Sequence, residues 1–261
     1  MQAVKLPAKA GFEWFIKGFA IFKKRPALFI LLAFVWNFNT ILSLQLLGVL
    51  GLFSVALVQP VYIAFILMCC HYVAEGQKLN WHNLFEPFRH GKTLKSLLLA
   101  GLVYGVILFI LEIFFVPSLI KESEVANILA STSNGEITAD TYTAIAASIN
   151  PAAIIVMFVY TIILTLVYWF VPALIMWNNV PTIKSLVFSC IGVVRNFAAF
   201  IALGLPMFII AFVIWNIMMI AISSGSTGAF FAFVLQIVLI SLLMTAYCAM
   251  YISYKQIYQN S

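Results

Sequence analysis

The chain has 261 residues, of which 64% are apolar or aromatic and only 8% are charged. Soluble globular domains carry roughly 25% charged residues, so the few acids and bases present cannot cover a water-exposed surface, and the composition predicts an integral membrane protein. The net charge of +6 is spread over short clusters of bases between long apolar runs, a distribution that argues against nucleic-acid binding.

Several apolar runs are long enough to cross a bilayer, which takes roughly 20 residues per helix. Residues 26–74 contain no Asp, Glu, Lys or Arg, which leaves room for two spans and a turn. Residues 196–254 are also uncharged, and the polar string 223–228 is the natural turn between their two spans. The predicted spans are residues 27–46, 50–74, 96–120, 152–177, 197–222 and 229–254.

The first pair of predicted spans, within residues 27–74, is open to two interpretations. Asn37, Asn39 and Thr40 lie inside the first span, and the turn near Gly48 is short and apolar. These features fit either two full spans or a partly re-entrant hairpin. A β-barrel is excluded, because its strands would alternate apolar and polar residues over about ten positions. The expected fold class is therefore all-α, a polytopic membrane protein with six transmembrane helices.

The bases give the orientation. With six spans, thirteen of the fourteen Lys and Arg residues fall on one side of the membrane, and the remaining base, Lys121, begins the loop of residues 121–150. Basic loops stay in the cytoplasm, so both termini are expected there, with loop 121–150 facing the periplasm. We expect one transmembrane domain, residues 1–261, in the bacterial inner membrane.

The cytoplasmic connections carry apolar stripes at helical spacing, which are typical of amphipathic helices lying in the membrane interface. The chain therefore suggests three repeats of one unit: an interfacial helix, a span out and a span back. Pro60 and Pro172 are expected to kink the second and fourth spans. Lys184, Ser185 and Arg195 are expected on the polar side of the third stripe. The stripes are Phe12, Phe15, Ile16, Phe19 and Phe22; Trp81, Leu84, Phe85 and Phe88; and Ile183, Leu186, Val187, Ile191 and Val194.

Short motifs near the spans carry a resemblance to a known family. The motifs are G-F-E-W-F at 11–15, F-K-K-R-P at 22–26, Gln59-Pro60, E-G-Q-K at 75–78 and L-F-x-x-F at 84–88. With them the chain resembles a widespread proteobacterial family of uncharacterised six-helix inner-membrane proteins. That family is distantly similar to the membrane domain fused to some glycerophosphodiester phosphodiesterases. The resemblance implies a membrane location and brings no activity and no catalytic residues.

No catalytic, cofactor or metal-binding motif is found, so we expect neither an enzyme nor a cofactor. The four cysteines lie in apolar surroundings and are expected to be free thiols. Gly101 and Gly105 form a G-x-x-x-G that allows close helix packing, more readily with a helix of the same chain than with a second copy. The candidate functional polar residues within the spans are Glu112, Gln59, Asn216 and Gln236, joined by Asn37 and Asn39 as possible interhelical hydrogen-bonding groups.

Glu112 is the single full charge well inside a predicted span, so it is expected to face the bundle interior and to be neutral. Two function hypotheses follow. The first is a non-enzymatic scaffold or accessory protein that binds lipid, a membrane-protein partner or a second copy of itself. The alternative is a small transporter or lipid-handling protein that uses Glu112 and the kinked second and fourth spans.

Overall fold

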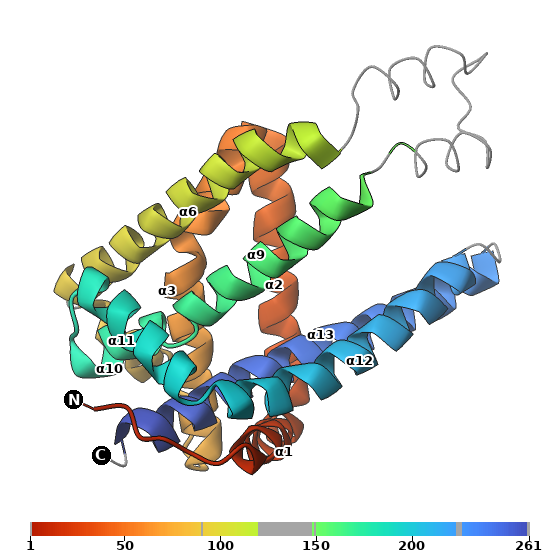
Figure 1. Ribbon diagram of the computed structural model, residues 1–261. Helices are drawn as coiled ribbons and strands as arrows, with labels where there is room; N and C mark the ends of the chain where they lie inside the picture. Colours follow the sequence, from red (N-terminus) through yellow and green to blue (C-terminus); the bar gives the residue numbers. More distant parts are fainter. Residues whose placement is uncertain (1, 90, 120–147, 149, 223–225, 260–261) are drawn as a thin grey trace, which may run out of the picture. The chain divides into compact units, whose positions relative to one another are not determined.

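A computed structural model of the chain describes residues 2–89, 91–119, 148, 150–222 and 226–259. This part of the chain is helical and contains no strand (Figure 1). Six of its helices are long and apolar enough to cross a membrane. The expected all-α class and the expected six spans are therefore confirmed, whereas most of the predicted outer loop 121–150 lies outside the described residues.

The first three helices are α1 (Lys9–Lys24), α2 (Pro26–Leu47) and α3 (Val49–Ala74). Proline is well placed at the first position of α2, because the first N–H groups of a helix have no partner within it. Gly48 turns the chain between α2 and α3 with φ 57°, a left-handed conformation that favours glycine. Since α2 has 22 residues and α3 has 26, the segment forms two full-length helices and not a short re-entrant hairpin.

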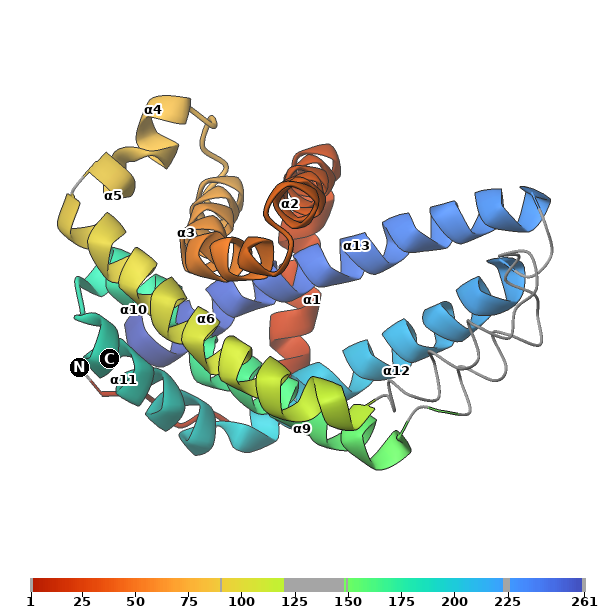
Figure 2. The same cartoon turned by 90° about the horizontal axis from the view of Figure 1, so that it is seen from above.

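The second cytoplasmic connection differs from the continuous stripe predicted over residues 81–89. It forms two four-residue helices, α4 (Trp81–Leu84) and α5 (Glu86–Arg89), which lie beside α3 (Figure 2). The interruption at Phe85 has a local cause, because Pro87 has no N–H to donate to the carbonyl oxygen of Asn83, and Pro87 instead lies in the first turn of α5, where that N–H is not needed. The next helix, α6 (Gly91–Leu119), begins five residues earlier than the span predicted from residue 96.

The fourth span is broken. Helix α9 (Pro151–Tyr168) ends before Trp169, and α10 (Val171–Asn178) begins again with Pro172 in its first turn. The backbone N–H of Phe170, which the break removes from the helical ladder, donates to the Oγ of Ser189 at 3.0 Å. The kink expected at Pro172 is thus a complete interruption, whereas Pro60 lies within the continuous helix α3.

The last part of the chain comprises α11 (Thr182–Arg195), α12 (Phe197–Ile222) and α13 (Ser226–Tyr254). A short π-helical turn, η2 (Lys255–Gln259), extends α13. Helices α12 and α13 pack side by side, and α1 packs against both of them. The N-terminal residues 3–6 lie against η2, so that the two ends of the chain are neighbours (Figure 1).

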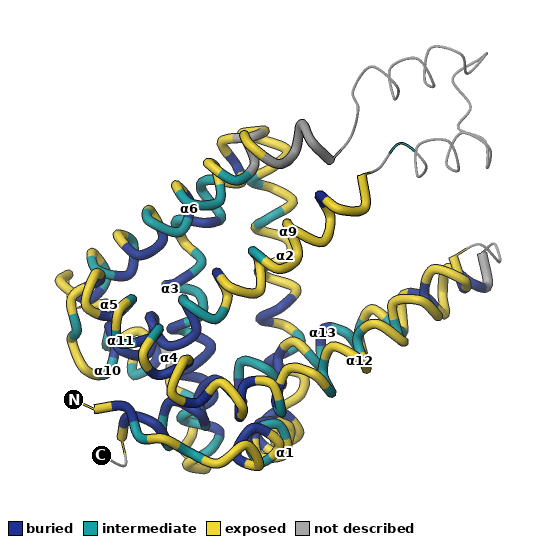
Figure 3. Tube along the Cα trace, in the orientation of Figure 1, coloured by how far each residue is buried: buried dark blue, intermediate teal, exposed yellow. Residues whose placement is uncertain are grey.

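The chain forms two compact units, one of residues 1–102 and 166–261 and the other of residues 103–165. In the first unit the buried core gathers at the ends of the helices that adjoin the basic connections (Figure 3). In the apolar stretch of α3, 39% of the residues are buried, against 17% in that of α12, so α3 is the more enclosed helix. The largest fully buried side chains include Trp14, Phe29, Ile66, Leu67, Leu97, Phe170, Leu174, Met244, Tyr251 and Tyr254.

Candidate functional site

Helix α1 packs on the bundle through glycines and through the large side chains of Trp14, Ile21 and Phe22. The glycines Gly11 and Gly18 belong to this buried face, and a Cβ atom at Gly11 would overlap the carbonyl oxygen of Ala199 in α12. The indole Nε1 of Trp14 donates to the Oε1 of Gln256 at 2.7 Å. Backbone contact of this closeness is possible only where side chains are absent.

Helix α11 uses the same kind of face. Ser185, Ser189 and Gly192 are buried, and a Cβ atom at Gly192 would overlap the phenol oxygen of Tyr258. Ser185, which was expected on the polar side of the third stripe, is fully buried, so its part of the helix faces the bundle. Its hydroxyl donates to the carbonyl oxygen of Thr182 at 2.7 Å, which removes the cost of burying a polar group.

One face of α1 and one face of α11 carry bulky apolar residues that point away from the bundle, although Phe22, the last residue of the first predicted stripe, is buried. Phe12, Ile16 and Phe19 are 53%, 52% and 44% exposed, while Ile183 and Val194 are 63% and 74% exposed. With 16 and 14 residues, α1 and α11 are both shorter than the roughly 20 residues that a span requires. They therefore present apolar faces without the length to cross a bilayer.

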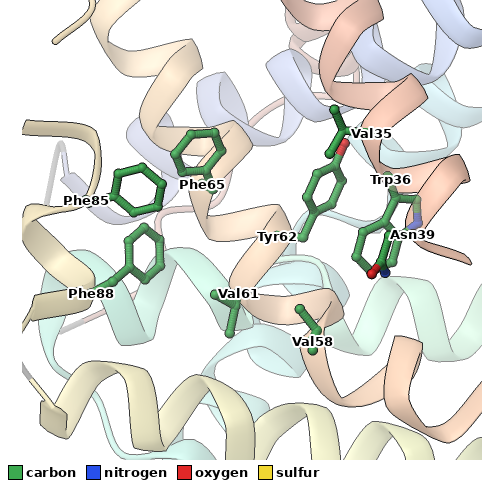
Figure 4. A pocket seen from close by; sticks show the side chains of 9 residues that line it. All are labelled: Val35, Trp36, Asn39, Val58, Val61, Tyr62, Phe65, Phe85 and Phe88. Atoms are coloured by element: carbon green, nitrogen blue, oxygen red, sulfur yellow. The ribbon is translucent and has the colours of Figure 1, made fainter. Parts of the chain in front are cut away.

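A pocket of about 290 Å³ lies between α2, α3 and the α4–α5 segment (Figure 4). Residues of α3 lie between a wall from α2 and the aromatic pair Phe85 and Phe88. The Trp36 and Tyr62 rings stack with centroids 4.4 Å apart, and the Tyr62 hydroxyl donates to the carbonyl oxygen of Leu32 at 2.6 Å. The lining residues are Val35, Trp36, Asn39, Val58, Val61, Tyr62, Phe65, Phe85 and Phe88.

A polar cluster joins the C-terminal ends of α3 and α13. The Nδ1 of His71 lies 3.0 Å from the hydroxyl of Tyr251, and the Nζ of Lys255 donates to the Oε1 of Glu75 at 3.1 Å. This hydrogen bond, together with the charge of Lys255, lowers the pKa of Glu75 below its ordinary value. Lys24 reaches the same place and donates to the carbonyl oxygen of Ala74 at 3.2 Å. Sequence reasoning missed this cluster, because its members are far apart along the chain.

Asn196, between α11 and α12, connects the N-terminal segment to the core. Its Oδ1 accepts from the N–H of Leu6 at 2.7 Å, and its Nδ2 donates to the carbonyl oxygens of Val4 and Gly192 at 2.9 Å each. The N–H of Val4 donates to the carbonyl oxygen of Ile257 at 3.0 Å. A buried side chain thus holds together three segments that the sequence pattern does not link.

The polar residues singled out from the sequence lie on different helices. Gln59 is half-buried on α3, whereas Asn216 on α12 and Gln236 on α13 are exposed. The amide of Asn216 donates to the carbonyl oxygen of Phe212 in its own helix at 2.7 Å, not to another helix. Glu112 belongs to α6, but its side chain lies outside the described residues.

The two glycines of the G-x-x-x-G motif are both buried on α6. A Cβ atom at Gly101 would overlap the backbone of Leu57, so α6 approaches α3 of the same chain at this point. The four cysteines are free thiols, with the sulfurs of Cys70 and Cys248 3.3 Å apart. Within the described part of the chain, no three His, Cys, Asp or Glu side chains come together as they would around a metal ion.

The comparisons with known proteins agree with this architecture. The chain is 26% identical over 258 residues to a protein of Burkholderia thailandensis named "Probable inner membrane protein", and the match covers 98% of this chain and 93% of that protein. The chain is a multi-pass protein of the bacterial inner membrane. It matches no protein-family model and no solved structure.

Proposed function

We propose that the protein is a non-enzymatic scaffold or accessory factor that binds lipid and membrane-protein partners through its basic side. The observation that carries this proposal is the build of α1 and α11. Each helix approaches the bundle closely at small residues and keeps a row of bulky apolar residues exposed on its other face, such as Phe12, Ile16 and Phe19 of α1. Such a helix is suited to lying in the membrane interface, with its apolar face in the lipid.

The charges next to these helices support the same role. Five bases on these two helices are exposed. They are Lys17, Lys23 and Lys24 on α1, and Lys184 and Arg195 on α11. Bases near an anionic lipid surface contribute about 1 kcal/mol each. The basic side would then be held at the headgroups, where a partner protein could dock alongside it.

The proposal includes the threefold plan and a cytoplasmic location for both termini. A single residue separates α1 from α2 and α11 from α12, so each short helix leads directly into a span. In the middle unit, α4 and α5 precede α6 in the same way, although they are short. The link to the membrane domain of phosphodiesterase fusions is likewise part of the proposal, as are the absence of enzymatic activity and of a cofactor.

Spin labels placed singly along residues 9–24 test the interfacial position of α1. We expect positions 12, 16 and 19 to respond to oxygen dissolved in lipid, and positions 13, 17 and 24 to respond to a water-soluble quencher. The alternation should follow the helical period of 3.6 residues. A flat profile along the segment would refute the interfacial helix.

Purification in native nanodiscs followed by mass spectrometry tests the scaffold role. We expect a membrane protein to co-purify in a fixed ratio, and we expect replacement of Phe12, Ile16 and Phe19 by Ser to reduce its recovery. The matched control replaces Phe208, Phe212 and Phe230 by Ser, which are exposed on the spans α12 and α13. A solute or lipid enriched without any protein partner would contradict the scaffold role and favour transport.

The second candidate is a small transporter or lipid-handling protein, which the break between α9 and α10 favours. Broken helices supply binding groups in many transporters. Here, however, the residues around the break, including Phe170, Val171 and Pro172, are buried among apolar neighbours. A proton- or cation-linked flux in proteoliposomes that is lost in Glu112→Gln, while the protein still inserts, would establish the second candidate in place of the first.

A further inference from the structure

The pocket between α2, α3 and the α4–α5 segment has walls suited to hydrocarbon. Seven of its nine lining residues are Val, Trp or Phe, and Asn39 and Tyr62 are the other two. The hydroxyl of Tyr62 donates a hydrogen bond to the carbonyl oxygen of Leu32, and the ring of Tyr62 stacks on that of Trp36. On the opposite side, the Phe65 and Phe85 rings lie 5.2 Å apart (Figure 4).

The pocket runs from the apolar part of the spans to a basic connection. Trp36 lies ten residues into α2, about 15 Å from the start of that helix at 1.5 Å per residue. At the other end Phe88 is followed directly by Arg89, which is exposed on α5. An occupant that fills the pocket would therefore be elongated, with one end near cationic side chains.

The connection at this end carries a positive charge. Residues 78–95 contain the bases Lys78, Arg89, Lys92 and Lys95, and one acid, Glu86. The guanidinium of Arg89 lies 3.0 Å from each ring nitrogen of His82. Lys92 and Lys95 are exposed in the first turns of α6. An anionic group is thus the complement of this end of the pocket.

We propose that the pocket is a binding site for an anionic phospholipid, with an acyl chain between Trp36 and Phe88 and the phosphate beside Arg89 and Lys92. The size of the pocket supports a chain-like occupant. About 290 Å³ is at the lower end of the range for small-molecule pockets, and an α-helix of a partner, about 10 Å across, would not fit. The site is separate from the exposed faces of α1 and α11, so it does not depend on the scaffold role.

Native mass spectrometry of the full chain, released from nanodiscs of defined composition, tests the site. The nanodiscs contain equal amounts of phosphatidylglycerol and phosphatidylcholine with the same acyl chains. We expect one phosphatidylglycerol molecule to be retained preferentially. Arg89→Gln and Lys92→Gln should each lower that preference about fivefold, which corresponds to about 1 kcal/mol per base. Lys5→Gln in the N-terminal segment, also an exposed base, is the matched control and should leave the preference unchanged.

Variants that fill the pocket test the position of the acyl chain. Val61→Trp should remove the retained lipid of either headgroup, whereas Val213→Trp on the exposed face of α12 should not. If Val61→Trp does not fold, Val35→Phe fills the same pocket from α2, where the side chain is 55% exposed. Equal retention of the two lipids by the unmodified protein, or undiminished retention in a folded filling variant, would overturn the proposal.

Discussion

At the scale of single residues, the side chain of Asn196 shows how one amide can organise distant segments. It lies where α11 passes into α12, is almost fully buried and uses both of its functional atoms. Asn216 has the same chemistry, but it is exposed and bonds within its own helix. The two side chains have the same hydrogen-bonding groups, but Asn196 links distant segments of the chain whereas Asn216 bonds only within its own helix.

We expect Asn196→Ala to lower the free energy of unfolding by about 3 kcal/mol, because three hydrogen bonds of about 1 kcal/mol each are lost. Equilibrium unfolding in mixed detergent micelles measures the change. Asn216→Ala is the control and should cost less than about 1 kcal/mol, since its single bond is exposed. Equal losses in the two variants would contradict the organising role of Asn196.

The ion pair between Glu75 and Lys255 gives a pH dependence. Because the pKa of Glu75 is lowered in the folded protein, its contribution is fully present above the ordinary glutamate pKa of about 4.3 and is lost as the pH falls through the lowered value. The difference in thermal midpoint between the unmodified protein and Glu75→Gln should therefore shrink as the medium is acidified below about pH 4.

The control for this pH dependence is Glu13→Gln. Glu13 pairs with Lys17 one turn further along α1, and both side chains are about half exposed. Such a pair contributes little, so Glu13→Gln should leave the midpoint nearly unchanged at every pH. A constant midpoint difference for Glu75→Gln down to about pH 3 would show that the pair does not contribute through its charge.

At the scale of elements, α1 and α11 follow one packing rule. Their small residues allow a close approach to α12, α13 and η2, and a row of larger apolar residues on the opposite face is left outside, while Trp14, Ile21 and Phe22 of α1 are buried beside the glycines. Amphipathicity alone would place the larger residues inside, as in a soluble protein. In a membrane the larger residues have an apolar solvent of their own, so close packing decides which face is buried.

Gly11→Ala tests this packing rule. The added methyl group would overlap the carbonyl of Ala199, so α1 must move, and we expect a loss of about 1 to 3 kcal/mol in unfolding free energy. Gly204→Ala on α12 is the control, because nothing lies within 4 Å of its added Cβ atom. That change should be neutral or stabilise by up to about 1 kcal/mol through helix propensity. A shift of both variants in the same direction would argue against the rule.

At the scale of the whole molecule, the basic residues predict a single orientation. A reporter that is active only in the cytosol should be active when fused after Ser261. A reporter that is active only in the periplasm should be active when inserted near Asn134, within the predicted outer loop. The physical reason is the retention of basic loops on the cytoplasmic side during insertion. Periplasmic activity at the C-terminus would mean that one span has been miscounted.

The sequence alone determined the membrane class and the number and approximate limits of the spans. The span predicted as 197–222 coincides with α12, and the segment 27–74 divides into α2 and α3 close to the expected turn. Long uncharged runs can be recognised this way because bilayer thickness imposes a length on every span. The division of residues 81–89 at Phe85 was missed, because the prediction rested on the helical spacing of the stripe and did not consider Pro87.

Only the tertiary structure decided which residues meet. The pairs of Asn196 with Val4, Tyr251 with His71 and Lys255 with Glu75 each join positions at least 180 residues apart. The aromatic pocket likewise needs α2, α3 and the α4–α5 segment to be placed together. The pattern of apolar and polar residues along one helix indicates which face is exposed to lipid or water, but it does not indicate which helix packs against the other face. Partners are set by close packing and by individual hydrogen bonds, which depend on all helices at once.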